Sequence, residues 1–227
     1  MRVIAIDGPA GSGKSTVARA LARRLDLDYL DTGAMYRAVA FAALRADVDP
    51  MDAEPVGRLA QSITLTVGDT VEVDGVDATI EIRGPEVTRA VSAVAANPVV
   101  RNEMRRRQRE WAQKRGGGVI EGRDIGSVVF PEAIVKVYLT ASDEERARRR
   151  SKEVLDLDYD TVAADIARRD HVDATRAHSP LVVPEGATLI DTSGRTIDEV
   201  VETVLQHVHD AEPGDGGEPT ERGGGQL

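Results

Sequence analysis

The chain has 227 residues, 41% of them hydrophobic, and a formal net charge of −10 at pH 7, which allows one good core, alone or with an inserted lobe. The charge disfavours general affinity for nucleic acid polymers and anionic membranes, and no apolar run approaches the ~20 residues of a membrane span. The absence of cysteine excludes disulfides, thiolate metal sites and cysteine catalysis, and together with the lack of a secretory signal it favours a cytoplasmic protein.

The first motif follows an apolar strand at residues 1–7 and reads G-x-x-x-x-G-K-S. This order of parts is the phosphate-binding loop of P-loop nucleotide-binding proteins, whose glycines turn backbone N–H groups toward a polyphosphate. A helix predicted over residues 15–25 adds its positive dipole end. In such loops the lysine, here Lys14, reaches the β- and γ-phosphates of ATP, and the hydroxyl of Ser15 ligates Mg²⁺. The predicted nucleotide-binding residues are Gly8, Pro9, Ala10, Gly11, Ser12, Gly13, Lys14, Ser15 and Thr16.

Short predicted elements follow this loop, at residues 29–33 (strand and turn), 33–46 and about 56–62 (helices). Residues 63–83 then change character. Apolar and polar residues alternate there in short runs that glycine turns separate, which is typical of antiparallel strands with one solvated face. The runs lie at residues 63–67, 71–74 and 80–82. We expect a small antiparallel meander inserted into the chain.

Strands and helices alternate again in the second half of the chain. Helices are predicted at residues 85–96, 98–114, 143–152, up to about 170, and 197–209, and strands begin at residues 119, 134 and 188. The alternation predicts an α/β fold with a parallel β-sheet flanked by helices on both faces. We expect a single domain over residues 1–210 and a disordered tail over residues 211–227, which is rich in Gly and charge and nearly devoid of apolar side chains.

Three further segments combine arginine with Asp or Thr, at residues 31–37, 121–126 and 169–176. Arginine binds phosphate bidentately with its planar fork, and 25 of the 29 basic residues are arginine. In the first segment the Thr32 hydroxyl is predicted to cap the next helix, with Arg37 one turn inside. The second segment follows a predicted strand, at the sheet edge where ligands bind in this fold class, and the third follows a predicted helix. Local arginine clusters in an acidic protein favour a small anionic substrate over a polymer.

Taken together, these motifs resemble the bacterial cytidylate kinases, which are nucleoside monophosphate kinases of the P-loop class. The matching pieces cover residues 3 to about 181 and read I-D-G-P-A-G-S-G-K-S, L-D-T-G-A-M-Y-R, E-I-R, V-S-A-V-A-A-N-P-V-V-R, E-G-R-D-I-G-S-V-V-F-P and R-R-D-x-x-D-A-T-R-A-x-S-P-L. The resemblance implies a P-loop NTPase fold with the insertion at about 63–83 as its monophosphate-binding lobe and a short lid at about 146–165. It also implies Mg²⁺-dependent transfer of the ATP γ-phosphoryl group to CMP or dCMP by a monomer.

The resemblance assigns site residues position by position. Ser92, Arg101 and Asp124 match the positions that read cytosine, whose amino group needs an acceptor and whose carbonyl and N3 need donors. The matches to sugar contacts are Arg169 and Asp173, and the matches to phosphate contacts are Thr32, Arg37, Arg123 and Arg176. The lid, which is shorter than in longer family members, offers Arg146, Arg149 and Arg150 to the transferring phosphoryl group. The expected catalytic residues are therefore Lys14, Arg123, Arg149 and Arg176.

Two alternatives remain at this level. A kinase for UMP or AMP would share the fold and differ in the base-reading positions. A non-enzymatic nucleotide-dependent switch would need the P-loop but not a second arginine-rich site. The chain lacks the N-K-x-D motif that reads guanine and any signature of a transport ATPase, which disfavours those two classes of P-loop protein.

Overall fold

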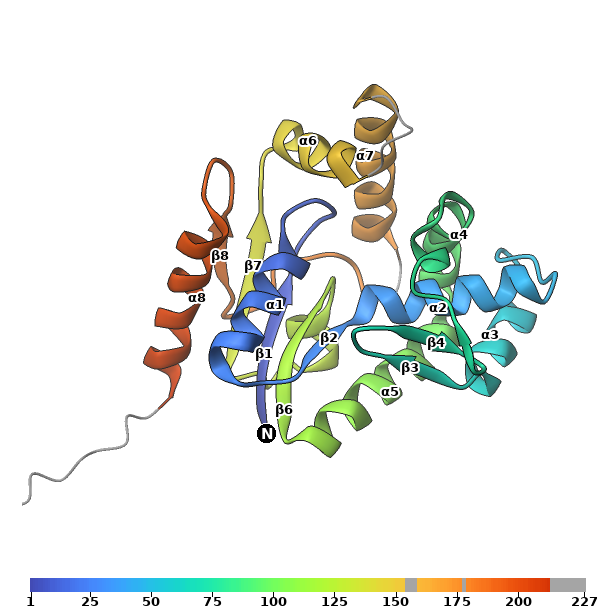
Figure 1. Cartoon of the computed structure of the whole chain (residues 1–227), viewed down its shortest axis with the longest axis horizontal. Helices are drawn as coiled ribbons and strands as arrows, with labels where there is room; N and C mark the ends of the chain where they lie inside the picture. The colour runs from blue at the N-terminus through green and yellow to red at the C-terminus, as the bar shows by residue number, and fades with distance from the viewer. Residues whose placement is uncertain (154–158, 177–178, 213–227) are drawn as a thin grey trace, which may run out of the picture.

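The computed structural model describes residues 1–153, 159–176 and 179–212. A five-stranded parallel sheet with the order β2-β6-β1-β7-β8 lies at its centre (Figure 1). The strands are β1 (Arg2–Asp7), β2 (Tyr29–Asp31), β6 (Gly117–Gly122), β7 (Val135–Thr140) and β8 (Thr188–Asp191). The predicted parallel sheet of an α/β fold is confirmed.

The side chains of β1 alternate between two separate hydrophobic cores. Ile4 and Ile6 pack in one cluster with apolar residues of α1 (Lys14–Leu25) and α8 (Ile197–Ala211). Val3 and Ala5 pack in the other cluster with α2 (Thr32–Arg45) and α5 (Pro98–Arg115). Because successive side chains of a strand point to opposite faces, a central strand buried on both faces is apolar along its buried part, as β1 is from Val3 to Ile6.

A second lobe packs beside the sheet, on the right in Figure 1. It contains α3 (Ala53–Ser62), β3 (Leu65–Val67), β4 (Val71–Val73), β5 (Val76–Asp77), a 3₁₀-helix (Glu81–Arg83) and α4 (Pro85–Ala96). The expected antiparallel meander is present, but the prediction of its third strand at residues 80–82 is wrong. Asp74 and Gly75 both have positive φ and form a tight turn, so the third strand starts at once.

Two helices, α6 (Asp143–Glu153) and α7 (Tyr159–Thr175), stand above the carboxyl ends of the strands (Figure 1). The helix predicted to end near residue 170 runs on to Thr175, so the third arginine motif lies in the last turns of this helix, and only Arg176 follows it. Part of the expected lid, residues 154–158, and nearly all of the expected tail lie outside the described residues. Among the helices that the structure describes, none combines the length and the apolar character needed to cross a membrane.

The strand register places two loops at one edge of the sheet. Asp7, the last residue of β1, pairs with Gly122 of β6 on one side and with Tyr138 of β7 on the other. The P-loop follows Asp7, and the second arginine motif follows Gly122. A five-residue π-helix, Ile125–Val129, then continues that second loop.

Candidate functional site

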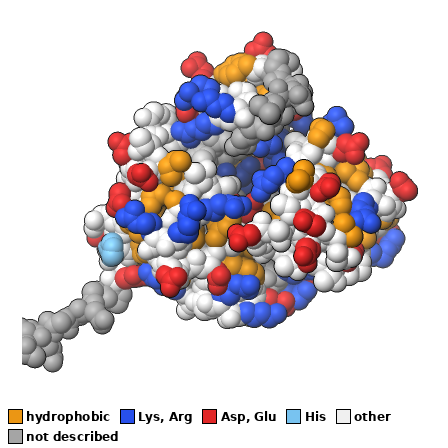
Figure 2. Space-filling model, viewed as in Figure 1, with side chains coloured by type: hydrophobic (Ala, Val, Ile, Leu, Met, Phe, Trp, Pro, Cys, Tyr) orange, Lys and Arg blue, Asp and Glu red, His pale blue; other side chains and the backbone are white. Residues whose placement is uncertain are grey.

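A cavity lies between the lid helices, the second lobe and the carboxyl edge of the sheet. Figure 2 shows the hollow with Lys and Arg side chains on its walls. The cavity joins the P-loop to all nine acceptor-site residues expected from the sequence, although these come from five different parts of the chain. Its lining includes Lys14, Ser15, Thr32, Arg37, Ser92, Arg101, Arg123, Asp124, Arg169, Asp173 and Arg176.

The P-loop has the backbone that its glycines predict. Gly13 has φ 86° and is the residue before α1, so the loop enters the helix through a conformation that favours glycine. A Cβ atom on Gly8 would lie 2.1 Å from the carbonyl oxygen of Leu139, which leaves no room for a side chain between β1 and β7. These positions hold the loop close against the sheet edge.

Lys14 is held inside this loop. Its side chain is only 6% exposed, and its Nζ donates to the carbonyl oxygen of Pro9 at 2.7 Å. Burial, with the nearby positive charge of Arg123, lowers the pKa of Lys14 to about 7. An anion placed in the loop would favour the charged ammonium again.

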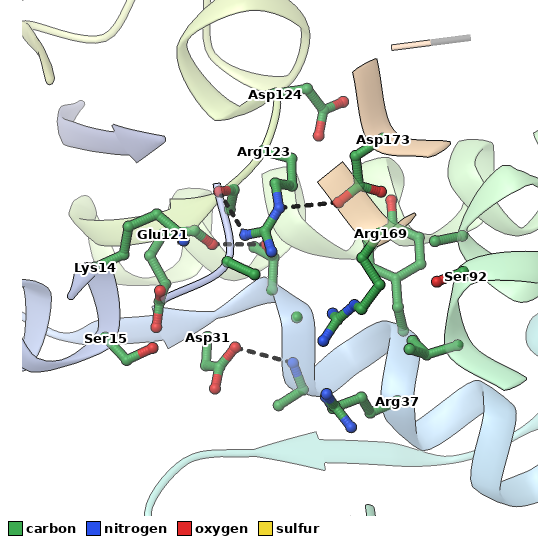
Figure 3. A pocket seen from close by; sticks show the side chains of 18 of the residues that line it. Lys14, Ser15, Asp31, Arg37, Ser92, Glu121, Arg123, Asp124, Arg169 and Asp173 are labelled. Atoms are coloured by element: carbon green, nitrogen blue, oxygen red, sulfur yellow. Dashed lines mark hydrogen bonds and ion pairs between the residues drawn. The ribbon is translucent and has the colours of Figure 1, made fainter. Parts of the chain in front are cut away.

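Two carboxylates face the start of α1 (Figure 3). Asp31 and Glu121 are paired residues of the neighbouring strands β2 and β6, and the Tyr29 hydroxyl donates to Glu121. Burial, with the nearby charge of Asp31, raises the pKa of Glu121. With Ser15, these oxygens are the ligand type that Mg²⁺ prefers, and Mg²⁺ commonly takes only one or two carboxylates from a protein. Neither carboxylate was predicted as a site residue from the sequence, although each lies in a segment that combines arginine with Asp or Thr.

The cap of α2 differs from the prediction. Asp31, not Thr32, is the N-cap residue, and its carboxylate accepts from the backbone N–H of Ala34 at 2.9 Å. The Thr32 hydroxyl instead donates to the carbonyl oxygen of Glu121 at 2.6 Å. The helix begins one residue earlier than expected, which moves the capping position to Asp31 and ties the start of α2 to β6.

Four arginines converge in the middle of the cavity: Arg37, Arg123, Arg169 and Arg176. Burial, with the charges of neighbouring arginines, lowers the pKa of Arg37 to about 9 and that of Arg169 to about 10. Asp173 accepts from Arg123 at 3.1 Å and from Arg176 at 3.3 Å. One carboxylate among these guanidinium groups leaves a buried excess of positive charge, which favours an anion with several acceptor oxygens.

Helical spacing explains how the third motif reaches this place. Arg169, Asp173 and Arg176 are four and three residues apart, so the last turns of α7 present them on one face. Arg176 follows directly after the helix, and its Nε donates to the carbonyl oxygen of Ser179 at 2.5 Å.

The far end of the cavity holds a buried ion pair. The Arg101 Nη2 donates to the Asp124 carboxylate at 2.5 Å, and its Nη1 donates to the carbonyl oxygen of Ala95 at 3.1 Å. The guanidinium carbon lies 5.4 Å from the centre of the Tyr36 ring, and Ser92 lines the same end. Arg101 is only 4% exposed, and within the described chain its buried Nε has no hydrogen-bond partner. Donors and an acceptor are therefore fixed together against an aromatic face.

The three arginines expected in the lid, Arg146, Arg149 and Arg150, face different surroundings. The structure does not bring Arg149 into this cavity: two of its nitrogens donate to the hydroxyl and carbonyl of Thr192 at 2.8 Å. Arg150 lines the cavity instead. Arg146 pairs with Asp170 and donates to the carbonyl oxygen of Ala10 at 3.0 Å, which attaches α6 to the P-loop. Arg149 faces a second cavity, lined also by Gly13, Thr16, Lys152, Arg195 and Ile197.

The family model and the curated relatives agree on one family, and the solved structures show a similar fold. A family model described as "Cytidylate kinase" matches residues 4–210. A cytidylate kinase from Mycolicibacterium paratuberculosis is 51% identical over 88% of this chain and 92% of its own, and one from Desulforamulus reducens is 52% identical over 91% and 96%. The solved structure of TT1252 from Thermus thermophilus has a TM-score of 0.51 at 24% identity, over 94% of this chain and 98% of that chain.

Proposed function

The chain belongs to the cytidylate kinase family, and from that premise we infer how its residues divide the transfer of the ATP γ-phosphoryl group to CMP or dCMP. One observation supports this assignment of roles: a single cavity joins the P-loop to an arginine-rich centre and to the buried ion pair of Arg101 and Asp124. An adenylate or uridylate kinase would need other readers there. A nucleotide switch without phosphoryl transfer would not need the second site at all.

The donor triphosphate occupies the P-loop in this proposal. Backbone N–H groups of the P-loop surround the β-phosphate, and the Lys14 ammonium reaches toward the γ-phosphate. Ser15 would hold Mg²⁺, with Glu121 and Asp31 receiving its bound waters. When bound, the ion neutralises charge on the phosphates. The donor base would extend into the second cavity, beside Arg149 and Thr192.

The acceptor monophosphate occupies the arginine-rich centre. Arg37, Arg123 and Arg176 hold its phosphate with Thr32, and Arg169 with Asp173 contacts the sugar. The pairing of Arg123 and Arg176 with Asp173 supports this division, because one carboxylate holds two guanidinium forks near their expected target.

The base would lie at the far end of the cavity. Asp124 accepts from the cytosine amino group, while Arg101 and Ser92 donate to N3 and the ring carbonyl. The existing ion pair orients both side chains before the base arrives, so little reordering is needed on binding.

The chemistry needs charge compensation more than proton transfer. The acceptor oxygen is already ionised, so no general base is required, and the problem is the repulsion between two anionic substrates. Lys14, Arg123 and Arg176, which line the same cavity, offset that repulsion. Approach of α6 and α7 would exclude water, a competing acceptor. We further propose that the enzyme acts as a monomer in the cytoplasm.

The proposal is tested by ADP release from MgATP with CMP, dCMP, UMP, AMP and GMP as separate acceptors. We expect strong turnover with CMP and dCMP and weak turnover with the others. Strong turnover with a different monophosphate would leave phosphoryl transfer in place and refute the base-reading roles. No turnover with any acceptor would favour the switch.

A second expectation concerns the sugar. Asp173→Ala should lower kcat/KM for CMP more than for dCMP, because only CMP offers a 2′-hydroxyl to this carboxylate. The variant's kcat/KM should also fall somewhat for both substrates, since Arg123 and Arg176 lose their shared carboxylate partner. Steady-state kinetics on both acceptors measure the difference, and equal losses would remove the sugar role.

A further inference from the structure

The loop that carries Arg123 and Asp124 continues into the π-helix Ile125–Val129, a rare conformation with poor intrinsic stability. Its bonds start from Asp124 itself, whose carbonyl oxygen accepts from the backbone N–H groups of Val128 at 2.9 Å and Val129 at 3.1 Å. The position of the expected base reader is therefore tied to the π-helix. Such a short helix needs partners at both ends to hold it in one place.

At its beginning, the π-helix is held by a carboxylate from the central strand. Asp7 Oδ1 accepts from the N–H of Ile125 at 2.8 Å, and Oδ2 accepts from the N–H of Gly126 at 2.7 Å. Asp7 is fully buried. Burial raises its pKa to about 6, and the nearby Asp124 carboxylate acts in the same direction, whereas the two N–H groups and the Lys14 charge oppose it. Burial of a carboxylate costs free energy unless hydrogen bonds compensate it, and the two N–H groups of the π-helix supply them here.

At its end, the π-helix is held by an arginine from α5. Arg109 Nε donates to the carbonyl oxygen of Val129 at 2.9 Å, and its Nη2 donates to that of Val128 at 3.2 Å. The carbonyls at a helix end lack partners within the helix, and a cation there both satisfies them and suits the dipole. The two ends thus receive groups of opposite charge, each matched to its end.

We propose that Asp7 and Arg109 are positioning residues for acceptor recognition, which hold the π-helix at both ends and thereby fix Asp124 and Arg123. This inference rests on the proposed role of Asp124 in reading the base. Asp7 is also the residue directly before the P-loop, so one side chain sets the distance between the donor loop and the acceptor loop. Neither residue lines the cavity, and both act through the loop.

The primary experiment compares Asp7→Asn and Arg109→Ala with the unaltered enzyme, by steady-state kinetics with CMP and UMP. Asparagine keeps the shape of Asp7 but turns an NH₂ group toward a backbone N–H. We expect each variant to raise the KM for CMP by ~10-fold and to lower the CMP-to-UMP ratio of kcat/KM by a similar factor, since small misplacements at a site have large effects. Arg109→Ala should leave the KM for ATP unchanged, and Arg109→Lys should restore part of the lost CMP affinity.

A matched control lies two residues away on the same helix. The Arg107 Nη2 donates to the carbonyl oxygens of Ala60 and Ile63, both at 3.0 Å, and so closes the end of α3 as Arg109 closes the π-helix. Arg107→Ala should lower the thermal midpoint without changing the KM for CMP or the CMP-to-UMP ratio. If Arg107→Ala and Arg109→Ala change these two quantities equally, the proposal is overturned, because general destabilisation would then explain both.

A double-mutant cycle separates this inference from the assignment beneath it. If Asp7 acts through Asp124, then Asp7→Asn should not lower the CMP-to-UMP ratio further in an Asp124→Asn background. Additive losses would overturn the inference while leaving Asp124 as base reader. An Asp124→Asn enzyme with an unchanged ratio would overturn the base-reading assignment and the inference with it. Should Asp7→Asn fail to fold, Arg109→Ala carries the same cycle.

Discussion

Replacing Lys14 with alanine is expected to lower kcat by ~10³ or more, because the ammonium interacts with charge that develops during phosphoryl transfer. The lysine is buried within the P-loop, and its Nζ is already directed by the Pro9 carbonyl. Steady-state kinetics with CMP and MgATP measure the loss of kcat, and near-normal turnover would refute the P-loop assignment.

The pKa of Lys14 provides a second readout for the same variant. In the free protein burial lowers this pKa to about 7, so part of the population is neutral at pH 7 to 8. A bound triphosphate raises the pKa, because it stabilises the charged form. ATP binding should therefore take up protons in this pH range, which calorimetry in buffers of different ionisation enthalpy detects. Lys14→Ala should abolish the uptake, whereas the exposed Lys114→Ala should change neither the uptake nor kcat.

The sequence predicted the central sheet well, since its signals are local. The apolar run of β1 followed by the P-loop glycines leaves few alternatives, and the strand–helix alternation implies parallel pairing. The third strand of the meander was predicted wrongly because Ile80 and Ile82 alternate with Glu81 just as strand residues do. The pattern alone cannot tell a strand from a 3₁₀ turn when the run is so short; here Ile82 is buried and Ile80 is exposed.

The site was predicted less completely, because side-chain direction depends on helix rotation and packing. Arg148, Arg149 and Arg150 are consecutive in α6, and at 3.6 residues per turn they point to different sides. Arg148 pairs with Glu145, Arg149 reaches Thr192 and Arg150 lines the main cavity. A run of arginines predicts a basic helix but not which member faces the substrates.

Buried partners of the site were also missed for a physical reason. Asp7 is the last residue of β1 and Glu121 the last but one of β6, and an apolar run that predicts a strand gives no role to a polar residue at its end. Their roles depend on which strands are neighbours: Asp7 reaches the loop after β6 because β1 pairs with β6. That order is a property of the whole sheet, and no local pattern encodes it.

Asp124→Asn is expected to lower kcat/KM for CMP by ~10²-fold and to shift preference toward UMP. Cytosine presents an amino donor where uracil presents a carbonyl acceptor, and the substitution replaces an acceptor oxygen by an NH₂ donor. Sites that hydrogen-bond a substrate group discriminate strongly because the wrong partner leaves buried polar groups unpaired. The measurement is kcat/KM for CMP and UMP with saturating MgATP. An unchanged ratio would place the base elsewhere.

Asp124→Ala separates reading of the base from support of Arg101. Alanine removes the acceptor and also leaves a guanidinium that is 4% exposed without its ionised partner. Loss of one member of a buried ion pair costs about 3–5 kcal/mol of unfolding free energy, whereas asparagine still accepts from Arg101 and should cost less. The free energy of unfolding measured by chemical denaturation should therefore be highest with aspartate at position 124, lower with asparagine and lowest with alanine. The Asp124→Ala enzyme should lose CMP turnover without a shift of preference toward UMP, because alanine offers uracil no donor. A shift of equal size in Asp124→Asn and Asp124→Ala would mean that the charge of Asp124, rather than its hydrogen bond, excludes uracil.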